Sequence, residues 1–164
     1  MENSAHPQRK RIRLPEFDYS SRGAYYLTVC VKDRRPVLSQ IYKSPTGEAM
    51  VRLLSRGLSV ERTILRIPKA YPDVTLYSYI IMPDHVHLVL GIGCNDSAQE
   101  ALTQKSATNI STIMKSLKRI TNHEIGEDLW QPRYHDHVIR SEQDLITKIQ
   151  YVETNPLRYL LRSE

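Results

Sequence analysis

The sequence predicts an α+β fold of the ferredoxin-like type: an antiparallel sheet with helices packed on one face, followed by an additional C-terminal helix. Three observations indicate this fold. The chain has 164 residues, the size of one domain. Its apolar residues follow a strand period in some segments and a helix period in others, in the order strand, helix, strand, strand, helix, strand, helix. The two consecutive strands are separated by only two residues, which requires antiparallel pairing.

The first strand is expected from Ala24, where AYYLTVCVK alternates and is rich in β-branched and aromatic residues. Residues 1–23 are polar and predict a basic N-terminal arm before a single domain over 24–164. The segment from Gly47 to about Arg66 spaces its leucines as a helix does, with Gly57 as an interruption. We expect that helix to end before Pro68.

The strands VTLYSYIIM and HVHLVLGI are expected to form a hairpin around Pro83 and Asp84. The polar segment GCNDSAQEALTQKS predicts a flexible connection. From Ile110 the apolar residues follow the i, i+3, i+4, i+7 rule of an amphipathic helix. YHDHVIR, Tyr134 to Arg140, predicts a fourth strand. The last helix opens at Ser141 with capping-box spacing and is expected to stop at Pro156.

His85 and His87 begin the second arm of the hairpin, within YIIMPDHVHLVL. Side chains two apart on a strand share a face, so both imidazoles point to one side while Val86 and Leu88 point to the other. Neutral imidazoles placed in this way can bind one metal ion. Taken alone, however, the spacing favours two partly buried histidines that are satisfied by backbone carbonyls.

The last helix carries two further candidates, Tyr151 and Asn155, which are neighbours at i and i+4. At 100° per residue, one apolar stripe contains Leu145, Ile146, Ile149 and Val152. Roughly the opposite side contains Asp144, Lys148, Tyr151 and Asn155. A phenol can act as a nucleophile and an amide oxygen can bind a hard cation. The alternative is an exposed tyrosine with Asn155 serving as a helix-end residue.

The overall composition narrows the setting. Lys and Arg number 23 against 18 Asp and Glu, so the net charge is +5, which suits a polyanionic partner without identifying one. Cys30 and Cys94 form neither a CxxC pair nor a disulfide framework, which predicts a reducing, cytoplasmic setting. No apolar run approaches the ~20 residues of a membrane helix, so we expect no membrane partner.

Four motifs together carry a resemblance to a known family. The segment FDYSSRGAYYLTVCVKDRRPVL, residues 17–38, is followed in order by YIIMPDHVHLVL, WQPRYHDHVIR and YVETNPLR. Over about residues 11–158 the chain resembles the REP-associated tyrosine transposases, which are single-tyrosine HUH transposases of the insertion-sequence type. Four linked motifs are far more specific than one HxH pair.

The resemblance implies a DNA strand transferase with endonuclease activity on single-stranded or hairpin DNA. It implies that His85, His87 and Asn155 bind a divalent metal, Mg²⁺ or Mn²⁺, and that Tyr151 attacks a DNA phosphate to form a 5′-phosphotyrosine. It also implies a monomer acting in cis, although use of Tyr151 by a second subunit stays open. His135 and His137 belong to a shared family stretch, for which we favour a structural role.

Phosphate contacts are expected from basic side chains, because Lys and Arg supply much of the affinity for DNA. The candidates are Arg9, Lys10, Arg11 and Arg13 of the arm, and Lys115, Lys118, Arg119, Arg133 and Arg140 of the domain. Two other functions stay open. One is a nucleic-acid-binding module without catalysis, and the other is a metal-dependent nuclease that activates water in place of Tyr151.

Overall fold

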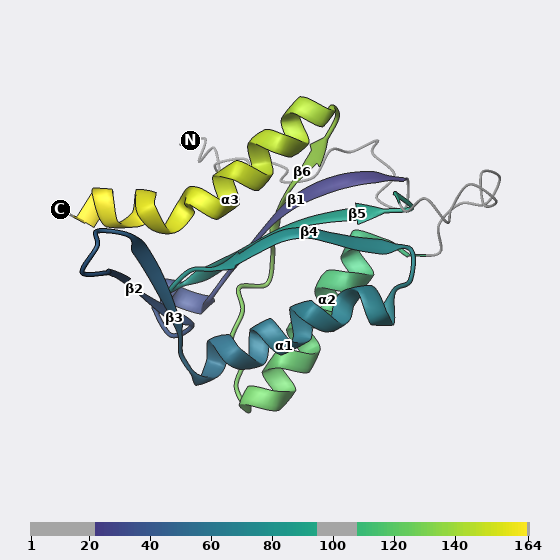
Figure 1. Ribbon diagram of the computed structural model, residues 1–164. Coiled ribbons are helices and arrows are strands. Elements are labelled where there is room, and N and C mark those ends of the chain that lie inside the picture. Colours follow the sequence, from purple (N-terminus) through teal and green to yellow (C-terminus); the bar gives the residue numbers. More distant parts are fainter. Residues whose placement is uncertain (1–21, 95–107, 164) are drawn as a thin grey trace, which may run out of the picture.

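The computed structural model describes residues 22–94 and 108–163, so the predicted basic arm with Arg9, Lys10, Arg11 and Arg13 and most of the predicted connection lie outside the described residues. The elements in chain order are β1 (Gly23–Cys30), a short 3₁₀ helix η1 (Lys32–Arg34), β2 (Ser39–Lys43), β3 (Ala49–Leu53), α1 (Ser55–Ala70), β4 (Val74–Ile81), β5 (His85–Ile92), α2 (Ile110–Ile125), β6 (His135–Ile139) and α3 (Glu142–Ser163) (Figure 1).

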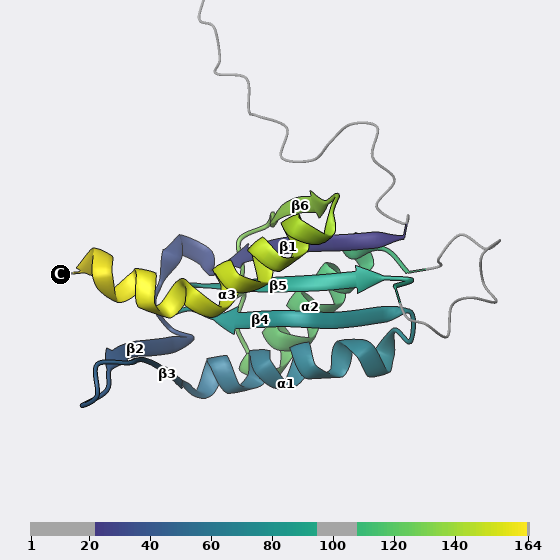
Figure 2. The ribbon, with the colours of Figure 1, turned by 45° about the horizontal axis from the view of Figure 1, so that its top comes forward.

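The main sheet has the strand order β4-β5-β1-β6, and every neighbouring pair is antiparallel. This order, with α1 between β1 and β4 and α2 between β5 and β6, is the ferredoxin-like arrangement predicted from the sequence, which is thereby confirmed. Helices α1 and α2 cover one face of the sheet, and α3 runs across the opposite face (Figures 1 and 2). The sheet therefore separates a conventional helical layer from the helix that carries Tyr151.

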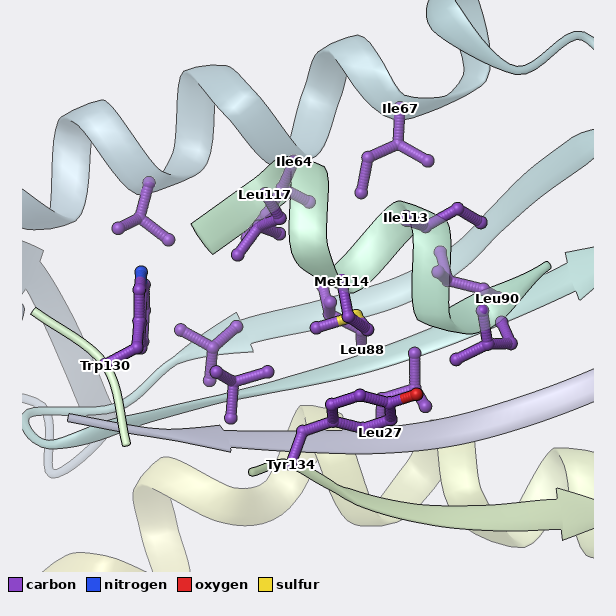
Figure 3. Close-up of a cluster of buried hydrophobic side chains, with 14 of the residues drawn as sticks. Leu27, Ile64, Ile67, Leu88, Leu90, Ile113, Met114, Leu117, Trp130 and Tyr134 are labelled. Carbon is purple, nitrogen blue, oxygen red and sulfur yellow. The ribbon is translucent and has the colours of Figure 1, made fainter. Parts of the chain in front are cut away.

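The main core lies between the sheet and the helices α1 and α2. Leu27, Leu88 and Leu90 are fully buried there against α1 and α2 side chains such as Ile64 and Ile113 (Figure 3). Because neighbouring side chains on a strand alternate between faces, the residues between these leucines point toward α3. One face of each central strand is thus buried in the main core, while the opposite face lies toward α3 and the site.

Helix α3 docks on the sheet through a smaller apolar cluster. Val152 is fully buried with Val89 and Ile139, and Leu145 and Ile149 pack beside them. Removing such side chains from water contributes roughly 25 cal/mol per Å² of apolar surface, which holds the helix in place. Ile146 was predicted to belong to the same stripe, and that part of the prediction was wrong, because its side chain is 41% exposed.

The predicted helix over 47–66 was wrong in its first part. Ala49–Leu53 forms strand β3, which pairs with β2 in a separate two-stranded sheet, and the helix begins only at Ser55. The apolar residues of 49–53 suit a short strand as well as a helix, so the pairing partner decides the outcome. That partner, β2, had not been predicted.

Two prolines were predicted to end helices and do not. Pro68 lies inside α1 and Pro156 lies inside α3, which continues to Ser163. A proline removes one helical hydrogen bond, and tertiary packing can offset that loss. Pro156 is itself buried, and the extra turns after it contact β2 and β3. In the part of the chain that the structure describes, no helix has the length and apolar character needed to cross a membrane.

Candidate active site

The predicted site residues from β5 and α3 meet on the α3 face of the sheet. They line a cavity of about 470 Å³ whose walls are Thr28, Arg34, Met82, Asp84, His85, His87, Tyr151, Asn155, Arg158, Tyr159 and Arg162. The strand alternation that buries Val86 and Leu88 on the other face directs both histidines into this cavity. Folding therefore joins two motifs that are far apart in the sequence.

The two histidines converge on one point. Their Nε2 atoms lie 3.1 Å apart, and their rings are steeply inclined with centroids 4.7 Å apart. The Nδ1 atom of His85 lies 2.5 Å from Oδ1 of Asp84, whose other oxygen accepts from Nε of Arg34 at 2.9 Å. A carboxylate at Nδ1 favours the tautomer with its proton on that atom. The lone pair of His85 Nε2 is then directed into the cavity.

His87 is held from its other edge. Its Nδ1 atom lies 2.8 Å from the hydroxyl of Tyr26 and 2.9 Å from the hydroxyl of Thr28. Burial lowers the pKa of His87 to about 3, with further lowering by His85 and Arg34. Burial also lowers the pKa of His85, against the opposing effect of Asp84. Both imidazoles are therefore neutral at pH 7, the form in which histidine binds metal ions.

Tyr151 stands beside this pair. Its ring is edge-on to that of His87, with centroids 5.8 Å apart, and edge-on to that of Tyr26 at 6.1 Å. The guanidinium carbon of Arg158 lies 5.1 Å from the centre of the Tyr151 ring. Burial raises the pKa of Tyr26 to about 12, so Tyr26 stays a neutral phenol that can hydrogen-bond His87. Of the two tyrosines, Tyr151 is the one that lines the cavity.

Asn155 lies one helical turn after Tyr151 and lines the same cavity, where its side chain is 8% exposed. The predicted placement of Asn155 opposite the apolar stripe was wrong, because the sheet-facing side of α3 buries both Val152 and Asn155. No group of three or more His, Cys, Asp or Glu side chains within residues 22–94 and 108–163 could hold a metal ion. A cation bound by the two imidazoles would therefore need another kind of donor, and the amide oxygen of Asn155 is a suitable one.

Several cavity residues were not predicted from the sequence. Arg158 and Arg162 follow Tyr151 at i+7 and i+11, a spacing that keeps them on one helical face. That signal was present but required the helix to continue past Pro156. Arg34 comes from η1, where it and Asp33 have left-handed backbones with φ of 54° and 57°. No spacing rule in the sequence pointed to Arg34 or to its partner Asp84.

The basic residues predicted from α2 do not line this cavity. Lys115 and Arg119 are exposed on α2, across the sheet from α3 (Figure 1). The ammonium of Lys118 donates to the carbonyls of residues 131–133, at 2.7 to 3.2 Å, and so ties α2 to the following loop. Arg133 and Arg140 are exposed at the two ends of β6.

The second histidine pair lies on β6. The Nε2 atom of His137 is 2.8 Å from Oδ2 of Asp144, which joins β6 to the first turn of α3, and His135 is exposed. This hydrogen bond lowers the pKa of Asp144. Ser141 adds a second restraint, since its Oγ accepts from the backbone N–H of Asp144 at 3.1 Å. The contact of His137 is of the structural kind that the sequence favoured.

Comparison with known proteins adds a family to this geometry. A family model described as "Transposase IS200 like" matches residues 19–155. An uncharacterized protein of Haemophilus influenzae is 29% identical, over 94% of this chain and 92% of its own. A REP-associated tyrosine transposase of Escherichia coli is 20% identical, over 86% of this chain and 70% of its own.

One solved structure also resembles the chain. It is described as a REP-associated tyrosine transposase bound to a REP hairpin, and it superposes with a TM-score of 0.65. The alignment covers 90% of this chain and 74% of that one, with 19% sequence identity. At this identity the likeness concerns the fold.

Proposed function

The chain belongs to the IS200-like transposase family, and from this premise we propose that it cleaves and rejoins single-stranded DNA at hairpin-forming repeats through a covalent 5′-phosphotyrosine. The observation that carries the proposal is the position of Tyr151. Its ring lies edge-on to that of His87, in a cavity that His85 and Asn155 also line. A phenol is a weak nucleophile at neutral pH and needs a polarised phosphate, which a cation held by the neighbouring imidazoles would supply.

We assign His85, His87 and Asn155 as the ligands of a divalent cation. The site offers two convergent, neutral Nε2 atoms and an amide oxygen, with the carboxylate of Asp84 orienting His85 from behind, and the family resemblance implies Mn²⁺ or Mg²⁺ as the ion. Such an ion, when bound, polarises a phosphate as a Lewis acid. Neutrality of both imidazoles at pH 7 supports this assignment, because no proton has to be displaced from the buried pair.

The chemical step is a displacement at phosphorus by Tyr151. The bond from its phenolic oxygen to phosphorus forms while the bond from phosphorus to the 3′-oxygen breaks. One proton leaves the phenol and one joins the 3′-oxygen, so the products are a 5′-phosphotyrosine and a 3′-hydroxyl. Attack by a different 3′-hydroxyl reverses the step and rejoins DNA without a nucleotide cofactor.

Positive charge around Tyr151 supports an anionic substrate. Among the described residues, Arg34, Arg158 and Arg162 line the cavity together with one carboxylate, that of Asp84. Guanidinium groups bind phosphate oxygens through paired N–H donors. We therefore propose that Arg158 and Arg162 hold the phosphates next to the one attacked. Lys115, Arg119, Arg133, Arg140 and the N-terminal arm stay predicted contacts to more distant DNA.

The proposed substrate is a hairpin with unpaired flanks. The related structure with a TM-score of 0.65 is of a transposase bound to a REP hairpin. In this chain Tyr151 and the two histidines lie within one cavity of a single chain, which supports a monomer acting in cis.

The test is a denaturing gel after incubation with 5′-labelled and 3′-labelled hairpin DNA in Mg²⁺ or Mn²⁺. We expect the 3′-labelled DNA to form a covalent adduct, because the fragment on the 3′ side of the cut carries the 5′-phosphotyrosine. The adduct should be lost in Tyr151→Phe and on chelation of the metal. Cleavage that survives in Tyr151→Phe would instead show a nuclease that activates water. Binding without cleavage by the unaltered protein would show a binding module.

A further inference from the structure

A second cavity adjoins the one that contains Tyr151. Its volume is about 540 Å³, and its lining residues are Pro36, Ser39, Gln40, Ile41, Tyr42, Arg52, Pro83 and Tyr159. Most of these residues belong to the β2–β3 hairpin, which stands apart from the main sheet below the C-terminal half of α3 (Figures 1 and 2). Cavities of roughly 300–1,000 Å³ accept ligands the size of small organic molecules.

Two tyrosine rings give this cavity its character. Tyr42 is 47% exposed and Tyr159 is 39% exposed, although large aromatic side chains are normally well covered. Pro36, Ile41 and Pro83 add apolar surface to the same cavity. Exposed aromatic rings beside a basic surface are the usual platform for stacking unpaired nucleobases.

The polar groups of the cavity suit the edge of a base. Gln40 and Arg52 face each other across β2 and β3, and the guanidinium of Arg52 donates to the amide oxygen of Gln40. This bond engages the oxygen of the Gln40 amide, so the two N–H donors of the amide stay available to a ligand. Amide and guanidinium groups are the side chains that read base edges through paired hydrogen bonds.

The two cavities are neighbours that share Tyr159 as a lining residue. Tyr159 follows Tyr151 by eight residues on α3, about 12 Å along the helix axis at 1.5 Å per residue. Arg158 and Arg162, which line the first cavity, flank Tyr159 in the sequence. A DNA strand held by these arginines would thus pass from Tyr151 into the second cavity.

From this arrangement we propose that the cavity between the β2–β3 hairpin and α3 binds an unpaired nucleobase of the DNA strand, close to the phosphate that Tyr151 attacks. The base stacks on Tyr42 and Tyr159, while Gln40 and Arg52 bind its edge and contribute sequence preference. The inference rests on the proposed function, because it takes single-stranded DNA as the occupant.

The test uses full-length Tyr151→Phe protein, so that binding is measured without cleavage. Hairpin oligonucleotides carry one 2-aminopurine, moved through the unpaired positions on both sides of the hairpin. Stacking quenches 2-aminopurine fluorescence, so we expect strong quenching at one or two adjacent positions. Adding Tyr42→Ala should remove that quenching and weaken binding about tenfold, the size expected for loss of one stacked base.

Two control variants make the result specific. Tyr42→Phe keeps the ring and should behave like the parent protein. Leu65→Ala removes an exposed apolar side chain of α1, which packs on the other face of the sheet, and should change nothing. An equal loss of affinity for a hairpin that lacks unpaired flanks would overturn the inference, since the defect would then not concern an unpaired base.

Unchanged quenching at every position in Tyr42→Ala would also overturn the inference, because the base would then not stack on Tyr42. Failure of the proposed function has a different signature. In that case the protein with Tyr151 intact forms no covalent adduct, whatever residue occupies position 42.

Discussion

The ring of Tyr151 stands edge-on to that of His87, with the two centroids 5.8 Å apart, in a cavity lined by both residues. The two residues belong to different elements, α3 and β5, which are far apart in the sequence, so only the tertiary fold brings them together. Val152 fixes the relationship, because it is fully buried against Val89 of the same strand that carries His87. Burying the residue next to the nucleophile thus sets the position of the nucleophile itself.

Asp84→Asn should raise the Mn²⁺ concentration needed for half-maximal adduct formation by about 10- to 100-fold. Asp84 accepts from His85 Nδ1, and loss of such a carboxylate weakens both the orientation and the basicity of a ligating histidine. The measurement is a Mn²⁺ titration of adduct formed under single-turnover conditions. Asp128→Asn alters an exposed carboxylate paired with Lys32 and serves as the control. Identical Mn²⁺ midpoints for Asp84→Asn and the unaltered protein would contradict the assignment.

The buried His87 predicts that metal-free protein loses stability as the pH falls. Its pKa is about 3 when folded and 6.5 in the unfolded chain, so between these values the unfolded state binds the extra proton. Stability from this group is complete above pH 6.5 and decreases below it, by at most about 1.4 kcal/mol per pH unit. Urea unfolding in a chelator at pH 7.5, 6 and 5 should show a steeper decline than in His87→Gln. Parallel declines would refute the prediction, because other titrating groups are shared by both proteins.

Arg158→Ala should slow adduct formation about tenfold and weaken binding of single-stranded DNA. The guanidinium lies over the Tyr151 ring and lines the cavity, where it would pair with phosphate oxygens. Loss of one phosphate contact should also reduce the slope of log affinity against log salt by about 0.7 for a single strand. Arg66→Ala, which removes an exposed arginine of α1 on the other face of the sheet, is the matched control. A salt slope unchanged by Arg158→Ala would show that Arg158 does not contact phosphate.

Gly57→Ala should destabilise the protein despite the better helix propensity of alanine. A Cβ at this position would lie 2.1 Å from the carbonyl oxygen of Leu38, which is backbone and cannot rotate away. Propensity favours alanine by about 1 kcal/mol, whereas overpacking typically costs about 1–3 kcal/mol. The free energy of unfolding in urea should therefore fall by up to about 2 kcal/mol. A more stable variant would show that α1 and the backbone of Leu38, just before β2, can separate at little cost.

The sequence predicted most of the sheet because its central strands have two distinct faces. Alternation placed Val86 and Leu88 on one side of β5 and the two histidines on the other, and the structure agrees. The tyrosine transposase assignment, made from four linked motifs, is confirmed by the family match over residues 19–155. The roles of His85, His87, Tyr151 and Asn155 stay predictions for the gel and titration experiments.

The errors lie where short-range pattern was ambiguous. Residues 49–53 were assigned to a helix because strand β2, their partner, has no strong signal of its own. Pro156 was taken as a helix end, which hid Arg158 and Arg162 from the predicted site. In both places long-range packing outweighed a local preference. For residues 49–53 that preference is small, since strand propensities span only about 1 kcal/mol. For Pro156 it is the loss of one helical hydrogen bond.

The sequence alone identified the candidate site residues and the strand face that His85 and His87 share, because side-chain alternation is a local property of a strand. The tertiary structure decided which faces meet. It laid α3 across the sheet opposite α1 and α2, brought Arg34 behind Asp84, and set the β2–β3 hairpin against the end of α3. These contacts join segments far apart in the chain, and their stability comes from apolar surface buried between elements, which no single segment encodes.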